Sequence, residues 1–190
     1  MATNMSKNIN GVNVDQLMQT INAIEENPSL AHFTFKAENE WIEGGHSRTT
    51  IKEFRGAGED GSSRTQAFEL HGDEPPVLLG ENKAPNAVEA ALHALASCLA
   101  TGFAYNAAAQ GIEIDQLEFD IEGELDLRAF LGLSEEVRPG YRNVRVRYRV
   151  KADAPREKLE ELCAYVQKTS PVMDIFTHAV PVSVEMEQIN

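Results

Sequence analysis

The sequence predicts an α+β fold in which antiparallel sheets surround one long central helix. Alternating apolar and polar residues mark several strands, and apolar residues at a 3.6-residue period mark separate helices. These elements follow one another in the order β-β-β-α-β-β-α-β after a first helix. Because the strands come in runs and do not alternate regularly with helices, the order favours α+β over a doubly wound parallel sheet.

The chain of 190 residues is long enough for one well-buried domain, so we expect a single domain over residues 1–190. Its first part, residues 1–30, is predicted to be a helical extension. Asn13 precedes an apolar stripe with helical spacing, and Gln16 stands three positions later, which is a capping-box pattern. Pro28 follows the last helical position and ends the helix.

Three strands are predicted next, over Phe33–Trp41, Arg48–Arg55 and Thr65–Leu70. The Gly44-Gly45 pair separates the first two and predicts a hairpin, so the three form an antiparallel meander. Residues 72–85 have no period and contain tandem prolines, which predicts a long loop. Loops of this length in a compact domain tend to serve a function or to reach a partner.

The longest helix is predicted around the uncharged segment Ala90–Ala109, with one apolar face that runs from Val88 to Phe103. The segment is long enough to cross a membrane, but it is rich in alanine and includes polar residues such as His93 and Asn106. We therefore interpret it as the central helix of the fold and expect no membrane span.

Two later strands carry opposite charge. Acidic residues alternate with apolar ones over Leu117–Leu127, and basic residues alternate with apolar ones over Val144–Lys151. Antiparallel pairing would set one charged face beside the other, and opposite charges across strands are stabilising. The basic stripe is therefore predicted to be a solvated face and not a nucleic-acid site.

The last part of the chain is predicted to hold a helix, a helical turn and a strand. An apolar stripe over Leu159–Val166 follows Pro155, which suits a first helical turn. Ser170-Pro171 predicts the start of a short helical turn, and the alternating residues Val180–Met186 predict a closing strand.

Charge and composition exclude several function classes. The net charge of −13 disfavours nucleic acid and anionic membranes as partners. Two cysteines make no disulfide framework and the polar start shows no export signal, so we expect a cytoplasmic protein. There is no glycine-rich phosphate loop, and the five histidines lack metal-ligand spacing, so we expect no cofactor and no metal site.

Cys98 is the candidate reactive residue, because it lies among small residues beside the apolar face of the central helix. A nucleophilic role needs access and a depressed pKa, which demand a nearby cation or a helix N-terminus. The alternative is an inert core thiol, since cysteine is among the most buried residue types. Cys163 falls on the apolar stripe of the last helix and is interpreted as core.

The central helix resembles a known family signature. The runs Pro85–Leu92 and Ala96–Leu99, followed by Ala108–Ile112, are similar to the central helix of the OsmC/Ohr family of osmotically inducible and organic-hydroperoxide-resistance proteins. The resemblance covers roughly residues 32–187. It implies an OsmC-like fold assembled as an intertwined homodimer, with sites at the subunit interface.

The resemblance also assigns roles to residues. In peroxidase members a first cysteine attacks the hydroperoxide, a second cysteine resolves the product, and an Arg and a Glu organise the site. Cys98 matches the first cysteine, whereas Ser170 stands where the second is expected. Glu89 and Arg48 are the candidate helpers, with Arg55 as the alternative arginine. For Glu89, helix capping is an equally open explanation, and for Ser170 helix capping is the favoured one.

Two functions remain open from sequence. The first is a thiol-dependent reductase of organic hydroperoxides that uses Cys98 and an external thiol reductant. The second is a non-catalytic dimeric module that binds a small hydrophobic ligand in an interface pocket roofed by Val77-Leu78-Leu79. Both predict a homodimer and an apolar small-molecule partner.

Overall fold

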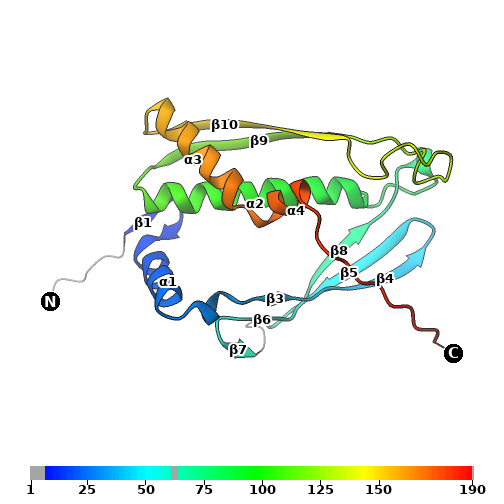
Figure 1. Cartoon of the computed structure of the whole chain (residues 1–190), viewed down its shortest axis with the longest axis horizontal. Helices are drawn as coiled ribbons and strands as arrows, with labels where there is room; N and C mark the ends of the chain where they lie inside the picture. Colours follow the sequence, from blue (N-terminus) through cyan, green and yellow to red (C-terminus); the bar gives the residue numbers. More distant parts are fainter. Residues whose placement is uncertain (1–6, 61–63, 190) are drawn as a thin grey trace.

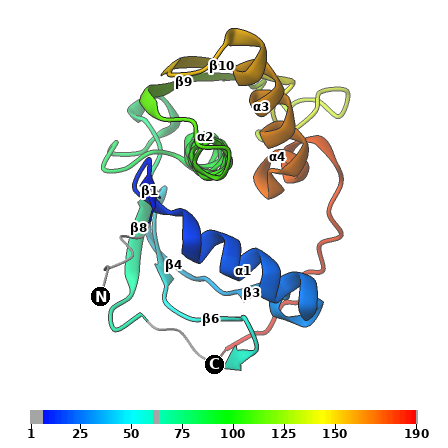
Figure 2. The ribbon, with the colours of Figure 1, turned by 90° about the vertical axis from the view of Figure 1, so that its left-hand side faces the viewer.

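A computed structural model describes residues 7–60 and 64–189. The helix α2 (Ala87–Ala109) runs through the middle of the molecule (Figure 1). Seen along the axis of α2 in Figure 2, the hairpin of β9 (Ile114–Glu124) and β10 (Asn143–Ala152) covers one side, and the N-terminal strands lie on the opposite side. All sheets in the described residues are antiparallel, which confirms the predicted α+β class with antiparallel sheets around a central helix.

The N-terminal segment is anchored to the start of β9. After the short pair β1 (Asn8–Ile9) and β2 (Val12–Asn13) comes α1 (Val14–Glu26), followed by a 3-10 turn over Pro28–Ala31. The Asn13 side chain accepts a hydrogen bond from the Gln16 backbone N–H at 3.1 Å, which confirms the predicted cap. Asn10 exchanges two hydrogen bonds of 2.9 Å with the backbone of Ile112 and Ile114, so α1 is held beside the core.

The predicted N-terminal meander is present, but its first two strands are each broken once. The six strands of this region are β3 (Thr34–Phe35), β4 (Glu38–Glu43), β5 (His46–Ile51), β6 (Phe54–Gly56), β7 (Glu59–Asp60) and β8 (Phe68–Gly72). They form two sheets, β4-β5-β8 and β3-β6-β7. The register shifts by one residue where β4-β5 gives way to β3-β6, because Glu38 faces Thr50 whereas Thr34 faces Arg55. One extra residue therefore divides the long hairpin into two sheets, as a β-bulge does.

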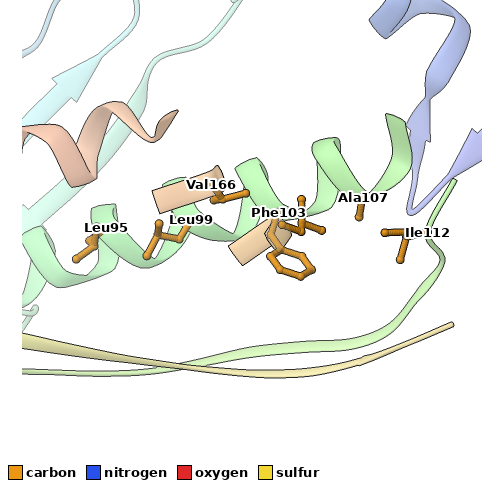
Figure 3. Close-up of a cluster of buried hydrophobic side chains, with 7 residues drawn as sticks. Leu95, Leu99, Phe103, Ala107, Ile112 and Val166 are labelled. Atoms are coloured by element: carbon orange, nitrogen blue, oxygen red, sulfur yellow. The ribbon is translucent and has the colours of Figure 1, made fainter. Parts of the chain in front are cut away.

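The core is centred on α2. Its buried residues Leu95, Leu99, Phe103 and Ala107 follow one face of the helix (Figure 3). They pack against the inward residues of β9 and β10 and against α3 (Arg156–Thr169), which contributes Leu162 and Val166. Burying an aliphatic or aromatic side chain of this size contributes about 1.5–3 kcal/mol. The helix α2 also has the length and apolar composition of a membrane span, and one face of it packs into this core.

The charged faces of β9 and β10 pair as predicted. Arg145 lies opposite Glu122 and Arg149 opposite Glu118 in the strand register. Their ion pairs measure 2.7 and 2.8 Å. Because these side chains are about half exposed, solvent screens each pair and its contribution to stability is small. The basic stripe is thus largely neutralised by its acidic neighbour.

The predicted C-terminal strand is wrong for the protomer. After α4 (Pro171–Thr177), residues 178–189 form neither helix nor strand. Val182 is 80% exposed and Val184 is 88% exposed. A strand needs a neighbour to satisfy its backbone N–H and C=O groups, and the described residues offer none here. The alternating pattern predicts a strand, but strand pairing depends on what lies beside the segment.

Candidate active site

Cys98 lies at a cavity and is not fully buried. It sits on α2 and is partly exposed. The cavity, about 600 Å³, lies between α2, α1, the end of α3 and the start of α4. Its lining is mainly apolar or small, and it comprises Leu17, Ile21, Ser97, Cys98, Thr101, Gly102, Tyr105, Asn106, Ala109, Val166, Thr169, Ser170 and Pro171. The thiol is therefore open to a small apolar molecule, as a reactive cysteine must be.

Ser170 directly contacts the Cys98 sulfur. The Ser170 Oγ donates a hydrogen bond to the Cys98 Sγ at 3.1 Å. The same oxygen accepts the Met173 backbone N–H at 3.2 Å and so caps α4. Because the Met173 N–H already supplies a proton to this oxygen, the hydroxyl proton is free to point at sulfur. Ser170 is 6% exposed, so this contact is shielded from water. A donor placed in this way stabilises negative charge on the sulfur.

Ser170 therefore has two structural roles, one as a helix cap and one as a neighbour of Cys98. Ser170 is the N-cap of α4, and it also occupies the position next to Cys98 where the resemblance expects a second thiol. A hydroxyl cannot form a disulfide, so Cys98 has no resolving partner at this position.

Close packing of α3 on α2 sets the position of Cys163. A Cβ on Gly102 would lie 3.0 Å from the Val166 Cγ1, so glycine allows the two helices to approach there. Gly102 faces Val166 and Cys98 faces Ser170, which means that the helices run antiparallel. Cys163 precedes Ser170 by seven residues, about 10 Å along a helix. This displacement is too large for a disulfide with Cys98, whose Cα atoms must come within about 7 Å.

Cys163 lies instead beside a buried tyrosine. Its sulfur accepts a hydrogen bond from the Gln167 Nε2 at 3.3 Å. The Tyr148 hydroxyl is near both sulfurs, and burial, followed by the proximity of Cys163 and then Cys98, raises the pKa of Tyr148 well above its usual value. Among the described residues, this hydroxyl has no well-aligned hydrogen-bond partner. Tyr148 is thus a neutral phenol in the core behind the two thiols.

Sequence reasoning missed Tyr148 as a neighbour of the cysteines. On β10 it stands in a series of inward-facing valines, and its ring packs edge-on against Phe119 with centroids 4.5 Å apart. The sequence feature that could have drawn attention to Tyr148 is its hydroxyl, because the valines of that series carry no polar group. Which sulfur it would meet depended on how β10 sits against α2.

Glu89 lies on the first turn of α2 and caps it. The Glu89 carboxylate accepts the Asn86 backbone N–H, and the Asn86 side chain accepts the Glu89 backbone N–H, both at 2.9 Å. Glu89 precedes Cys98 by nine residues, about 13 Å along the helix. Within the protomer it therefore does not touch the thiol, and its role as a site residue stays a prediction.

The two candidate arginines lie on the N-terminal sheets. The Arg48 guanidinium on β5 pairs with Glu40 on β4 at 2.7 Å, and this contact raises the pKa of Arg48. Arg55 lies on β6 in the other sheet. Neither lines the Cys98 cavity of the protomer, so a role at this site stays a prediction as well.

The predicted roof residues do not cover the Cys98 cavity within the protomer, and their place in a dimer stays a prediction. Val77 is 84% exposed and Leu79 is 92% exposed, and neither residue lines the Cys98 cavity. The turn at Pro76–Leu78 carries them outward, with Leu79 in the left-handed region at φ 66°. A leucine rarely adopts this conformation, so the turn is fixed by its surroundings. The apolar walls of the cavity come instead from α1, through Leu17 and Ile21.

Metal-ligating side chains do not converge in the part of the chain that the structure describes. No group of three or more His, Cys, Asp and Glu residues there is placed to hold a metal ion. Two imidazoles on neighbouring strands, those of His46 and His71, have nitrogens 3.0 Å apart.

Comparison with solved structures supports the fold. An OsmC-like protein from Mycoplasma pneumoniae is 16% identical, with a TM-score of 0.59, over 75% of this chain and 86% of that chain. A putative osmotic stress induced and detoxification response protein from Psychrobacter arcticus is 14% identical with a TM-score of 0.55, over 73% of this chain and 85% of that chain. An organic hydroperoxide resistance protein from Legionella pneumophila is 18% identical with a TM-score of 0.51, over 76% of this chain and 89% of that chain.

Sequence comparison identifies the family. A search of curated proteins gave no match. The family model described as OsmC-like protein matches residues 80–185, which is more than half of the chain and includes Cys98, Cys163 and Ser170. The resemblance seen in the central helix is therefore confirmed, and the chain belongs to the OsmC-like protein family.

Proposed function

We propose that this protein reduces organic hydroperoxides through the thiol of Cys98. The observation that carries the proposal is the Ser170 Oγ, which donates to the Cys98 Sγ at 3.1 Å beside an apolar cavity of about 600 Å³. Such a cavity favours a hydroperoxide with an apolar body, and Ser170 holds its hydroxyl at the sulfur that would attack it. A family neighbour named as an organic hydroperoxide resistance protein agrees with this chemistry.

The proposed first step transfers one oxygen atom. The Cys98 thiolate attacks the terminal oxygen of the hydroperoxide, the S–O bond forms and the O–O bond breaks. The alkoxide leaves, takes up one proton and becomes an alcohol. The thiol proton and the hydroperoxide proton account for the hydrogens of the two products, a sulfenic acid on Cys98 and the alcohol.

We propose an external thiol as the reductant. One small-molecule or protein thiol condenses with the sulfenic acid to give a mixed disulfide and water, and a second releases Cys98 as a thiol. An outside thiol is needed because Ser170 carries no sulfur and Cys163 lies about 10 Å away along α3. The cytoplasm, which is rich in such thiols, is the compartment that we propose.

We further propose that the working unit is an intertwined homodimer. One face of the β4-β5-β8 sheet carries Trp41, Phe68 and Leu70, which are 71%, 59% and 56% exposed. The C-terminal segment carries Val182 and Val184, which are more exposed still. Exposed apolar surface of this extent is typical of an interface. In a dimer, Glu89 and Arg48 are candidates to organise the site, and light scattering that gave a monomeric mass would contradict this arrangement.

The test of the proposed reaction compares two cysteine variants. Wild-type protein treated with cumene hydroperoxide should form a sulfenic acid that dimedone traps at Cys98, as peptide mass spectrometry would show. Cys98→Ser should lose both trapping and peroxide consumption. Cys163→Ser is the matched control and should keep them. If Cys98→Ser consumed peroxide as fast as wild type, the proposed reaction would be wrong.

A second candidate function is ligand binding without catalysis. The observation that favours it is that Glu89 and Arg48 are each engaged away from Cys98, at Asn86 and Glu40. The cavity would then hold a small hydrophobic molecule and the thiol would be incidental. Native mass spectrometry of the purified protein should reveal such a molecule as added mass. The Cys98→Ser variant should bind the same molecule.

A further inference from the structure

A second cavity, of about 400 Å³, lies along the N-terminal half of α2. The helix α4 separates it from the Cys98 cavity, because Pro171 lines the first cavity whereas Met173 and Phe176 line the second. Val88, Ala91 and Leu95 of α2 form another wall. The volume and the apolar walls suit one small molecule and not a macromolecular partner.

One wall of this cavity is fixed by its own contacts. The Tyr141 hydroxyl donates to the Val88 backbone carbonyl at 2.8 Å. A Cβ on Gly123 would lie 2.5 Å from the Tyr141 ring, so only glycine leaves room for the ring in this position. Burial, together with the nearby Glu89 charge, raises the pKa of Tyr141, so the phenol stays neutral. The ring is thus held in place before any ligand arrives.

Two arginines line the same cavity. Within the described part of the chain, neither Arg138 nor Arg142 has a carboxylate at ion-pair distance, whereas Arg145 and Arg149 farther along β10 are paired. Arg142 is close enough to Asp126 and Glu124 to help lower the pKa of both carboxyls, but hydrogen bonds from Arg128 to Asp126 and from Arg145 to Glu124 are the main causes. Two guanidinium groups therefore stand at an apolar cavity in a chain whose net charge is −13.

We propose that this cavity binds an amphipathic anion that carries one carboxylate. The apolar chain would lie between α2 and α4, and the carboxylate would meet Arg138 and Arg142. Guanidinium groups bind carboxylates through paired N–H donors, and arginine is less strongly hydrated than lysine, which suits the edge of an apolar site. This binding does not depend on the chemistry of Cys98.

The test uses the full-length protein and two probes of equal chain length. Dodecanoate and dodecanol are titrated against a bound fluorescent probe, dansyl-aminoundecanoic acid. Wild type should bind dodecanoate more tightly than dodecanol. Added salt should reduce this difference in affinity because it screens the exposed arginines. In Arg138→Gln/Arg142→Gln, dodecanoate should bind about tenfold more weakly, as expected for two exposed ion pairs, and dodecanol should be unaffected.

A matched control separates the site from total charge. Arg147→Gln/Lys168→Gln also removes two positive charges, from residues that do not line the cavity, and should bind dodecanoate as wild type does. Ala91→Leu, which adds bulk inside the cavity, should weaken both probes while its circular dichroism stays native.

Two outcomes would overturn the proposal. One is equal affinity of dodecanoate for wild type and Arg138→Gln/Arg142→Gln. The other is loss of dodecanoate binding when Cys98 is alkylated with a bulky maleimide, since the ligand would then occupy the first cavity. A protein without peroxidase activity would still give the predicted binding pattern, so failure of the proposed reaction and failure of this inference are distinguishable.

Discussion

Replacing Ser170 by cysteine should create a disulfide with Cys98. The Ser170 Oγ is 3.1 Å from the Cys98 Sγ, so a sulfur at this position needs to move by about 1 Å to reach the bonding distance of about 2.05 Å. Oxidation of Cys98 by one equivalent of hydroperoxide should then be followed by attack of the introduced thiol on the sulfenic acid, with release of water.

The stabilisation follows from the loop that the bond closes. Residues 98 and 170 are 72 positions apart, and cross-linking a loop of this size lowers the entropy of the unfolded chain by about 4 kcal/mol. Loss of the serine cap of α4 costs about 1 kcal/mol. The net gain of about 3 kcal/mol corresponds to a rise in Tm of roughly 6 to 12 °C for a chain of this length.

Thiol titration and thermal unfolding would check both parts of the prediction. The wild-type chain has two thiols and the variant three, so oxidation should leave the variant with the Cys163 thiol alone. The rise in Tm should disappear in dithiothreitol, and it should be absent in the control Ser170→Cys/Cys98→Ser. If three thiols persisted after treatment with peroxide and also with a direct thiol oxidant such as diamide, the placement of Ser170 against Cys98 would be refuted.

Three further predictions concern stability. Leu99→Ala should lower the free energy of unfolding in urea by about 2–5 kcal/mol, because Leu99 is fully buried in the core; a loss below about 1 kcal/mol would contradict that packing. The Arg128 contacts lower the pKa of Asp126 from 3.8 to about 2, so its contribution to stability is present above the unfolded value and is lost as pH falls towards 2. Asp126→Asn should therefore flatten the loss of stability between about pH 4 and pH 2 in acid titrations, and an unchanged slope would argue against the pair. Tyr148→Phe should keep or raise stability by up to about 1 kcal/mol, because the buried hydroxyl lacks a well-aligned partner; a clear loss of stability would show that the contact with Cys163 matters.

Most elements of the fold could be predicted from local patterns. Asn13, Asn86 and Ser170 each cap the helix that the sequence predicts after them. The charge alternation predicted that the acidic face of β9 pairs with the basic face of β10, and the observed register has this arrangement. Such patterns lie within one segment, so they can be recognised without knowing how the rest of the chain packs.

The failures all depend on what lies beside a segment. A one-residue shift divides the N-terminal hairpin into two sheets, and no residue type marks it. Residues 178–189 have a strand pattern without a strand, because pairing requires a neighbour that the protomer does not provide at this place.

The sequence by itself determined the α+β class, the central helix and Cys98 as the residue to examine, because these depend on periodicity and on residue types within one segment. Only the tertiary structure decided what surrounds the thiol. The crossing of α2 and α3 at Gly102 sets Ser170 against Cys98 and carries Cys163 away from it. Contacts between residues 72 positions apart depend on how helices pack, and helix packing depends on the whole core.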